Sequence, residues 1–122
     1  MCKSVLIVDK DIEMKEQLAG ELVEEGYNVV TAQHLGEVLE KALTSCASLV
    51  VVNLQSLDIS GWETISMIKK LNKSMTIITI TEDNSIEMER KIREEGVFFH
   101  FVKPFAIEDI KAVIKSAINT AK

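Results

Sequence analysis

The chain has 122 residues, of which 47% are hydrophobic and 27% are charged, with 5 glycines and a single proline. This composition is typical of one globular domain with its own core, and it argues against a disordered, collagen-like or repeat-array protein. Fourteen Lys and Arg against nineteen Asp and Glu give a net charge of −5, which disfavours nucleic acid or an anionic membrane as a direct partner because such binding needs a basic face.

Two hydrophobic periodicities alternate along the chain. Short apolar runs, such as Val5 to Val8, are typical of strands that are buried on both faces. Apolar residues at every third or fourth position, such as Met14, Leu18 and Leu22, are typical of amphipathic helices, and Gly26 can end the first of these. In chain order, the patterns predict a strand at 5–8, a helix over 14–22, a strand at 27–32, a helix over 35–43, a strand at 49–52, a helix over 62–71, a strand at 75–81, a helix over 86–95, a strand at 97–102 and a helix over 107–118.

Five strands that alternate with five helices require crossover connections, and these produce a parallel sheet with helices on both faces. The usual closed barrel needs eight repeats, so we expect an open, doubly wound α/β sheet in a single domain over residues 1–122. In such sheets the functional crevice lies beyond the carboxyl ends of the strands. The polar residues at those ends, which form the candidate site, are Asp9, Lys10, Asn53, Thr81 and Lys103.

The two cysteines, Cys2 and Cys46, are too few and too widely spaced for a disulfide framework or a CxxC motif. We therefore expect two free thiols. No apolar stretch approaches the roughly 20 residues of a membrane helix, and the first apolar run is shorter than that of a secretory signal. These features predict a cytoplasmic protein with no membrane partner.

Five short fragments stand on the predicted elements in a consistent order and spacing. They are Leu6-Ile7-Val8-Asp9, Val51-Val52-Asn53-Leu54, Ser60-Gly61, Ile80-Thr81 and Lys103-Pro104-Phe105. Together they resemble the receiver domain of two-component response regulators, the CheY-like family, over the whole chain. The resemblance implies a flavodoxin-like (βα)5 fold with five parallel strands in the order 2-1-3-4-5.

The resemblance also implies a phosphorylation site. In the family, an Asp at the end of the third strand accepts the phosphoryl group, and two acids after the first strand help to bind Mg²⁺. A Ser or Thr after the fourth strand and a Lys after the fifth contact the phosphoryl group. Asp9, Thr81 and Lys103 match these positions, whereas Asn53 replaces the phosphoacceptor and Lys10 replaces the second metal-binding acid.

These two departures remove the family's usual chemistry. The carboxamide of Asn53 is a poor nucleophile and forms no stable acyl phosphate. The ammonium of Lys10 cannot ligate Mg²⁺, which requires oxygen ligands, and together with Lys103 it makes the pocket around Asp9 net positive. We therefore predict weak or absent Mg²⁺ binding, no metal site, no cofactor and no enzymatic activity. The Lys10 ammonium either fills the vacant cation position or points into solvent.

Asn53 has a second interpretation, because a single engineered change from Asp to Asn would silence a working receiver. However, Lys10 is an independent departure, and the loop Gln55-Ser56-Leu57 lacks the Met-Pro pair that is common in the family. Several losses around one pocket favour a natural pseudo-receiver that acts through protein–protein interaction. Such a protein is either a stand-alone adaptor or the receiver of a longer regulator.

The fifth predicted strand carries candidate switch and partner residues. In a typical receiver the residue at the position of Thr81 couples to an aromatic residue on this strand, and here that residue is His100. His100 is either a pH-sensitive switch or a partly exposed histidine without a sensing role. Strand alternation places Phe98 and His100 on one face and Phe99 and Phe101 on the other.

Some of these rings belong to the core. The alternative is that the face formed by the fourth helix, the fifth strand and the fifth helix binds a protein partner, an output domain or a second copy of the chain. Beside the pocket, the resemblance implies a cis peptide at Lys103-Pro104 that orients Lys103, which we expect to pair with Asp9. Asp11 is expected to cap the first helix.

Two other function classes share parts of the pattern. Asp9-Lys10-Asp11 resembles the DxD signature of Mg²⁺-dependent haloacid-dehalogenase-type phosphatases, but the chain has no clear downstream acidic pair and no room for a lid. A flavodoxin-like FMN binder needs a phosphate-cradling loop rich in Ser, Thr or Gly after the first strand, whereas residues 9–13 are mainly acidic. Both classes fit the whole pattern less well than a receiver does.

Overall fold

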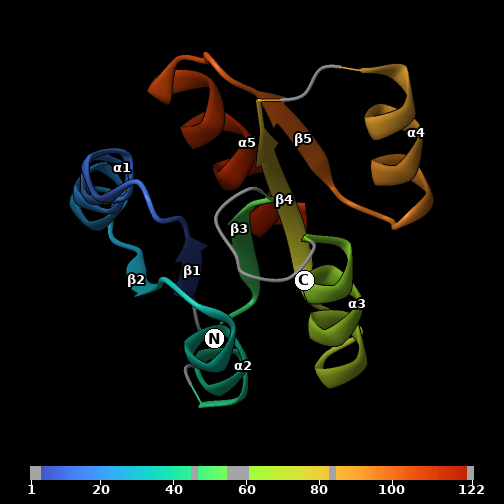
Figure 1. The fold of residues 1–122 in the computed structure, drawn as a ribbon. Coiled ribbons are helices and arrows are strands. Elements are labelled where there is room, and N and C mark those ends of the chain that lie inside the picture. The colour runs from blue at the N-terminus through green and yellow to red at the C-terminus, as the bar shows by residue number, and fades with distance from the viewer. Residues whose placement is uncertain (1–3, 45–46, 55–60, 83–84, 121–122) are drawn as a thin grey trace.

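A parallel β-sheet lies at the centre of the structure. The computed structural model describes residues 4–44, 47–54, 61–82 and 85–120. The strands form one sheet in the order β2-β1-β3-β4-β5, and every neighbouring pair is parallel (Figure 1). In chain order the elements are β1 (Ser4–Val8), α1 (Ile12–Glu24), β2 (Asn28–Ala32), α2 (Leu35–Thr44), β3 (Leu49–Asn53), α3 (Gly61–Leu71), β4 (Thr76–Thr81), α4 (Ile86–Glu94), β5 (Phe99–Val102) and α5 (Ile107–Thr120).

The predicted doubly wound fold is confirmed, including the parallel pairing and the strand order 2-1-3-4-5. The fifth strand is shorter than the predicted range 97–102 and begins at Phe99. Gly96, with a φ of 73°, redirects the chain after α4. The N–H of Phe98 then bonds to the carbonyl of Ile77 at 2.8 Å, before the regular pairing with β4 begins.

Helices cover both faces of the sheet. α1 and α5 pack on one face, and α2, α3 and α4 pack on the other (Figure 1). Consecutive residues of a strand point to opposite faces, so Val5 and Ile7 of β1 join the core under α1 and α5, while Leu6 and Val8 join the core under α2 and α3. Because both faces are covered, the central strands are apolar at almost every position.

Side-chain caps and one glycine fix the helix ends. The Asp11 carboxylate accepts a hydrogen bond from the N–H of Met14 at 3.2 Å, which confirms Asp11 as the N-cap of α1. The hydroxyl of Ser85 caps α4 in the same way through the N–H of Met88 at 3.2 Å. Gly26 adopts a φ of 93° just after α1, so the predicted helix end is also confirmed.

The carboxyl end of α4 is anchored to α3. The ammonium of Lys69 donates hydrogen bonds to the backbone carbonyls of Glu95 and Gly96, which lie at the negative end of the helix dipole. On the side that faces the sheet, Ile92 packs in the same core cluster as Ile68 of α3. These contacts fix the end of α4 that leads into β5.

None of the helices in the described part of the chain is long and apolar enough to cross a membrane. The two cysteines, the loop Gln55-Ser56-Leu57 and Ser60 lie outside the described residues. The predictions that concern them are therefore not addressed by the structure.

Gly20, inside α1, and Gly26, just after it, give a matched pair of substitutions. A methyl group at Gly20 or at Gly26 would meet no atom within 4 Å, so only the backbone conformation differs. Gly20→Ala should raise the free energy of unfolding by about 1 kcal/mol, because alanine favours the helix. Gly26→Ala should lower it by about 1–2 kcal/mol, because alanine is strained at positive φ. Urea denaturation followed by circular dichroism tests this, and changes of the same sign would contradict it.

Candidate functional site

Polar residues from four strands meet at one edge of the sheet. Asp9 follows β1, Asn53 ends β3, Thr81 ends β4 and Lys103 follows β5, and these strands are consecutive neighbours. Asp9, Asn53 and Thr81 are 1%, 6% and 0% exposed. Lys10 is exposed in the bend before α1. The structure thus brings the predicted pocket residues to one edge, with Lys10 at its surface.

Asp9 is bonded to both sides of the pocket. Its Oδ1 accepts the backbone N–H of Asp11 at 2.9 Å and the side-chain amide Nδ2 of Asn53 at 3.2 Å. The second bond joins the ends of β1 and β3, where both side chains are buried. A carboxylate at residue 53 has no hydrogen to donate and would repel Asp9, so the asparagine turns this contact from repulsive to attractive.

Lys103 forms its ion pair with a different acid from the one expected. Its Nζ lies 4.0 Å from Oδ2 of Asp11, whereas the sequence pointed to Asp9. The difference arises because Asp9 is buried under the start of α1 and Asp11 lies at its surface. The backbone N–H of Lys103 donates to the carbonyl of Thr81 at 2.8 Å, and the predicted cis peptide before Pro104 is confirmed.

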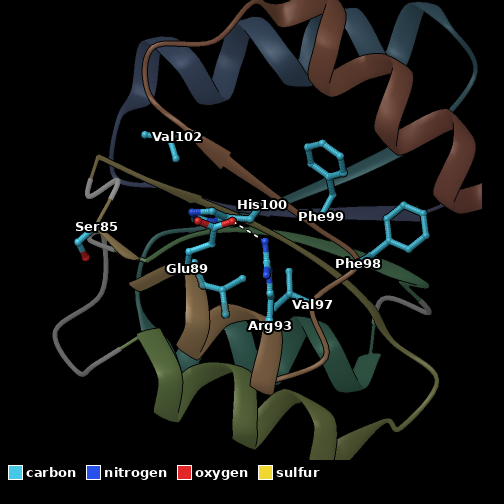
Figure 2. A pocket seen from close by; sticks show the side chains of 9 residues that line it. Ser85, Glu89, Arg93, Val97, Phe98, Phe99, His100 and Val102 are labelled. Atoms are coloured by element: carbon cyan, nitrogen blue, oxygen red, sulfur yellow. Dashed lines mark hydrogen bonds and ion pairs between the residues drawn. The ribbon is translucent and has the colours of Figure 1, made fainter. Parts of the chain in front are cut away.

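A second polar feature lies between α4 and β5. His100 is opposite Thr79 in the register of β4 and β5, and its Nδ1 is 2.8 Å from Oγ1 of Thr79. The ring is partly buried and lines a groove of about 490 Å³ together with Glu89 and Arg93 of α4 (Figure 2). Burial lowers the pKa of His100, and the nearby Glu89 carboxylate partly offsets this shift. The sequence linked His100 to Thr81, whereas the structure bonds it to Thr79.

The aromatic residues around β5 divide between the core and the surface. Phe101 is buried, and its ring centroid lies 4.8 Å from that of Phe99 and 5.1 Å from that of Phe105. The contact between Phe99 and Phe101 agrees with the predicted alternation. Phe98 and Phe99 are each 45% exposed and line the groove beside His100 (Figure 2). Two aromatic side chains are therefore available at the surface.

Comparison with known proteins identifies the family. The family model of the response regulator receiver domain matches residues 5–115. The chain belongs to the receiver-domain family. The probable transcriptional regulatory protein SilR of Salmonella typhimurium is 31% identical over 121 residues, which cover 94% of this chain and 50% of SilR. This receiver domain spans about half the length of such curated regulators.

Solved receiver domains have the same fold. A CheY-like receiver domain from Methanospirillum hungatei JF-1 superimposes with a TM-score of 0.91 at 27% identity, over 99% of this chain and 97% of that one. The receiver domain of NtrC4, solved as a beryllofluoride-activated dimer, gives a TM-score of 0.90 at 29% identity, over 98% and 99% of the two chains.

The Mg²⁺ that the receiver family implies can be tested against this donor set. Within the described residues, no group of three or more His, Cys, Asp or Glu side chains is arranged to hold a metal ion. Asn53 directs its amide nitrogen, not an anionic oxygen, toward Asp9, and Asp11 caps α1. Mg²⁺ demands oxygen ligands in near-octahedral geometry. The residues present therefore do not fit the ion.

Sequence reasoning missed the roles of Thr79, Glu89 and Arg93. Thr79 lies two residues before Thr81, so strand alternation places both on one face of the receiver's sheet. That signal was available, but it becomes useful only when the β4–β5 register is known. Glu89 and Arg93 have the i, i+4 spacing of a helical ion pair, and their Oε1 and Nη2 atoms are 2.7 Å apart.

Asn53→Asp tests the bond between the strand ends. We expect the free energy of unfolding to fall by about 2 kcal/mol at pH 7, because a hydrogen bond to a buried carboxylate is lost and a second negative charge is added. Since protonation relieves the repulsion, the loss should be smaller at pH 4 than at pH 7. Urea denaturation at both pH values measures it, with Asn28→Asp on the exposed start of β2 as control. Equal losses in the two variants would contradict the interpretation.

Proposed function

We propose that this two-component receiver domain is a pseudo-receiver, which signals by binding a protein partner and not by accepting a phosphoryl group. The observation that carries the proposal is the 3.2 Å hydrogen bond from the Asn53 amide to the Asp9 carboxylate. Asn53, the donor of this bond, stands at the position where a typical member of the family has its phosphoacceptor. In this proposal, binding of a protein partner regulates the receiver in place of phosphorylation.

The chemistry of the pocket supports the proposal in three ways. The Asn53 carboxamide has no anionic form that could attack a phosphodonor. The ammonium of Lys10 stands where the family has a second acid, and it repels a divalent cation. Lys103, which would contact a phosphoryl group, pairs with Asp11 at 4.0 Å. The nucleophile and the second metal-binding acid are therefore both replaced in this pocket, and its lysine is engaged by an acid of the protein itself.

The proposed partner face consists of α4, β5 and α5. Ile86 at the start of α4 is 74% exposed, and Phe98 and Phe99 are each 45% exposed. Aromatic side chains are enriched at protein interfaces, and the net charge of −5 does not suit nucleic acid. The occupant is a protein partner, an output domain or, as in the NtrC4 receiver dimer, a second copy of the chain.

Restoring the pocket tests the proposal. After incubation with Mg²⁺ and acetyl phosphate, the wild type should gain no phosphoryl mass, because nucleophile and metal ligand are both missing. The double variant Lys10→Asp/Asn53→Asp should bind Mg²⁺ and gain one phosphoryl group, and the variant Asn53→Asp should respond far less because Lys10 still repels the ion. Intact-protein mass spectrometry and Mg²⁺ calorimetry are the measurements.

Each alternative has its own signature in the same experiment. A site-specific adduct on wild-type Asn53 would overturn the proposal. Full phosphorylation of the single variant Asn53→Asp would favour a receiver silenced by one change. Mg²⁺-dependent hydrolysis of p-nitrophenyl phosphate by the wild type would favour the phosphatase class, although Asp11, the second Asp of its DxD motif, already caps α1.

Phe98→Ser and Val23→Ser form a matched pair for the partner face. Phe98 is 45% exposed beside β5, and Val23 is 58% exposed on α1, outside the proposed face. Phe98→Ser should reduce recovery of a specific protein from a lysate of the native host by about tenfold, the effect of removing an interface anchor worth roughly 1–2 kcal/mol. Sedimentation velocity on both variants reports whether the partner is a second copy. Equal recovery by both variants would exclude Phe98 from the interface.

A further inference from the structure

The strongest unassigned feature is the hydrogen bond between Thr79 and His100. Thr79 is completely buried, and its hydroxyl oxygen lies 2.8 Å from Nδ1 of the partly buried ring. The two residues are register partners across β4 and β5, so the backbone sets their separation. The Nδ1 edge of the ring is thus fixed in the sheet, and the ring lines the groove between α4 and β5 (Figure 2).

The charged side chains that lie near the His100 ring come mainly from α4. Glu89 is the carboxylate that acts on His100, and it raises the pKa of the ring against the larger, opposite effect of burial. Arg93 lies in the same groove and holds Glu89 through a 2.7 Å contact between Nη2 and Oε1 (Figure 2). The groove residues on β5 are uncharged apart from His100, and on β4 the ring meets the neutral hydroxyl of Thr79.

We propose that His100 is a proton-operated latch between the sheet and α4, which exchanges the partner of Glu89 and so changes the charge and shape of the groove. In the neutral ring, Nε2 carries the hydrogen on the side of Glu89, and Nδ1 accepts the hydroxyl hydrogen of Thr79. Proton uptake occurs at Nδ1. The Nδ1–H then donates to Oγ1 of Thr79, whose own hydrogen rotates away from the ring.

The imidazolium that results places a positive charge opposite Glu89. Glu89 then has two cations within reach, and the less exposed His100 competes with Arg93 for the carboxylate. Arg93 is 78% exposed in its side chain, so water replaces Glu89 around the guanidinium at little cost. The groove then carries one more positive charge, and the Arg93 guanidinium is free of Glu89. The new contact between Glu89 and His100 closes the middle of the groove.

The latch is independent of residue 53. It uses no group of the Asp9 pocket and stands whether or not the receiver is phosphorylated. A partner that enters the groove between Phe98 and α4 would meet the neutral ring at high pH and the closed form at low pH. Acid would therefore weaken binding at this groove without any change in the pocket.

A pH titration by NMR of the imidazole and guanidinium nitrogens tests the latch in the whole chain. The pKa of His100 should lie below the ordinary value for a histidine, because burial disfavours its charged form. The neutral ring should be the Nε2–H tautomer. The Arg93 side-chain signals should shift with the same midpoint as His100, because Arg93 loses Glu89 when the ring gains its proton.

Two exposed glutamates of α4 provide the matched variants. Glu89→Gln should move the His100 midpoint to lower pH and remove the Arg93 response, whereas Glu87→Gln in the same helix should change neither. The proposal is overturned if Arg93 does not respond at the His100 midpoint, or if Glu89→Gln leaves that midpoint where it is in the wild type. A His100 midpoint at or above the ordinary histidine pKa would also overturn it.

Discussion

The arrangement of this receiver depends on a parallel sheet that is covered by helices on both faces. Such a sheet has no solvated face, so a polar side chain inside it must find a hydrogen-bond partner. β3 carries only apolar side chains before its last residue, Asn53, and β1 is followed at once by the buried Asp9. The residues of the candidate pocket therefore gather at the carboxyl edge, where parallel strands end together, and the buried Thr79 inside β4 finds its partner in His100.

At that edge, the identity of residue 53 decides what holds the strand ends together. Two buried carboxylates would repel each other and would need a cation between them. The Asn53 amide instead supplies a hydrogen to Asp9 at 3.2 Å, so the contact is favourable without any ion. The same substitution that removes the nucleophile thus removes the structural reason for a metal. The favourable contact between the two strand ends in the unmodified pocket therefore depends on one side chain.

The alternation of strands and helices and the edge of the sheet that carries the candidate site could be predicted from local patterns in the sequence, whereas the strand order 2-1-3-4-5 came from the resemblance to the receiver family. Apolar runs, the glycine after α1 and the rule that sites follow strand ends need no knowledge of side-chain direction. The partner of Lys103 was predicted wrongly, since Asp9 and Asp11 are two residues apart and only the bend between β1 and α1 decides which is accessible. The bond from His100 to Thr79 was missed because it depends on the register of β4 and β5, which the sequence does not encode locally.

The two polar regions of the receiver share β4. Thr79 and Thr81 are both completely buried and lie on the same face of that strand. Thr79 holds His100, while the carbonyl of Thr81 holds the N–H of Lys103. A displacement of β5 relative to β4 would therefore disturb both bonds together. Because binding and protonation are linked reciprocally, a partner that prefers the neutral ring must lower the pKa of His100 by the same free energy that acid subtracts from its binding. The proposed latch would therefore couple the groove to pH through His100, independently of the residue at position 53.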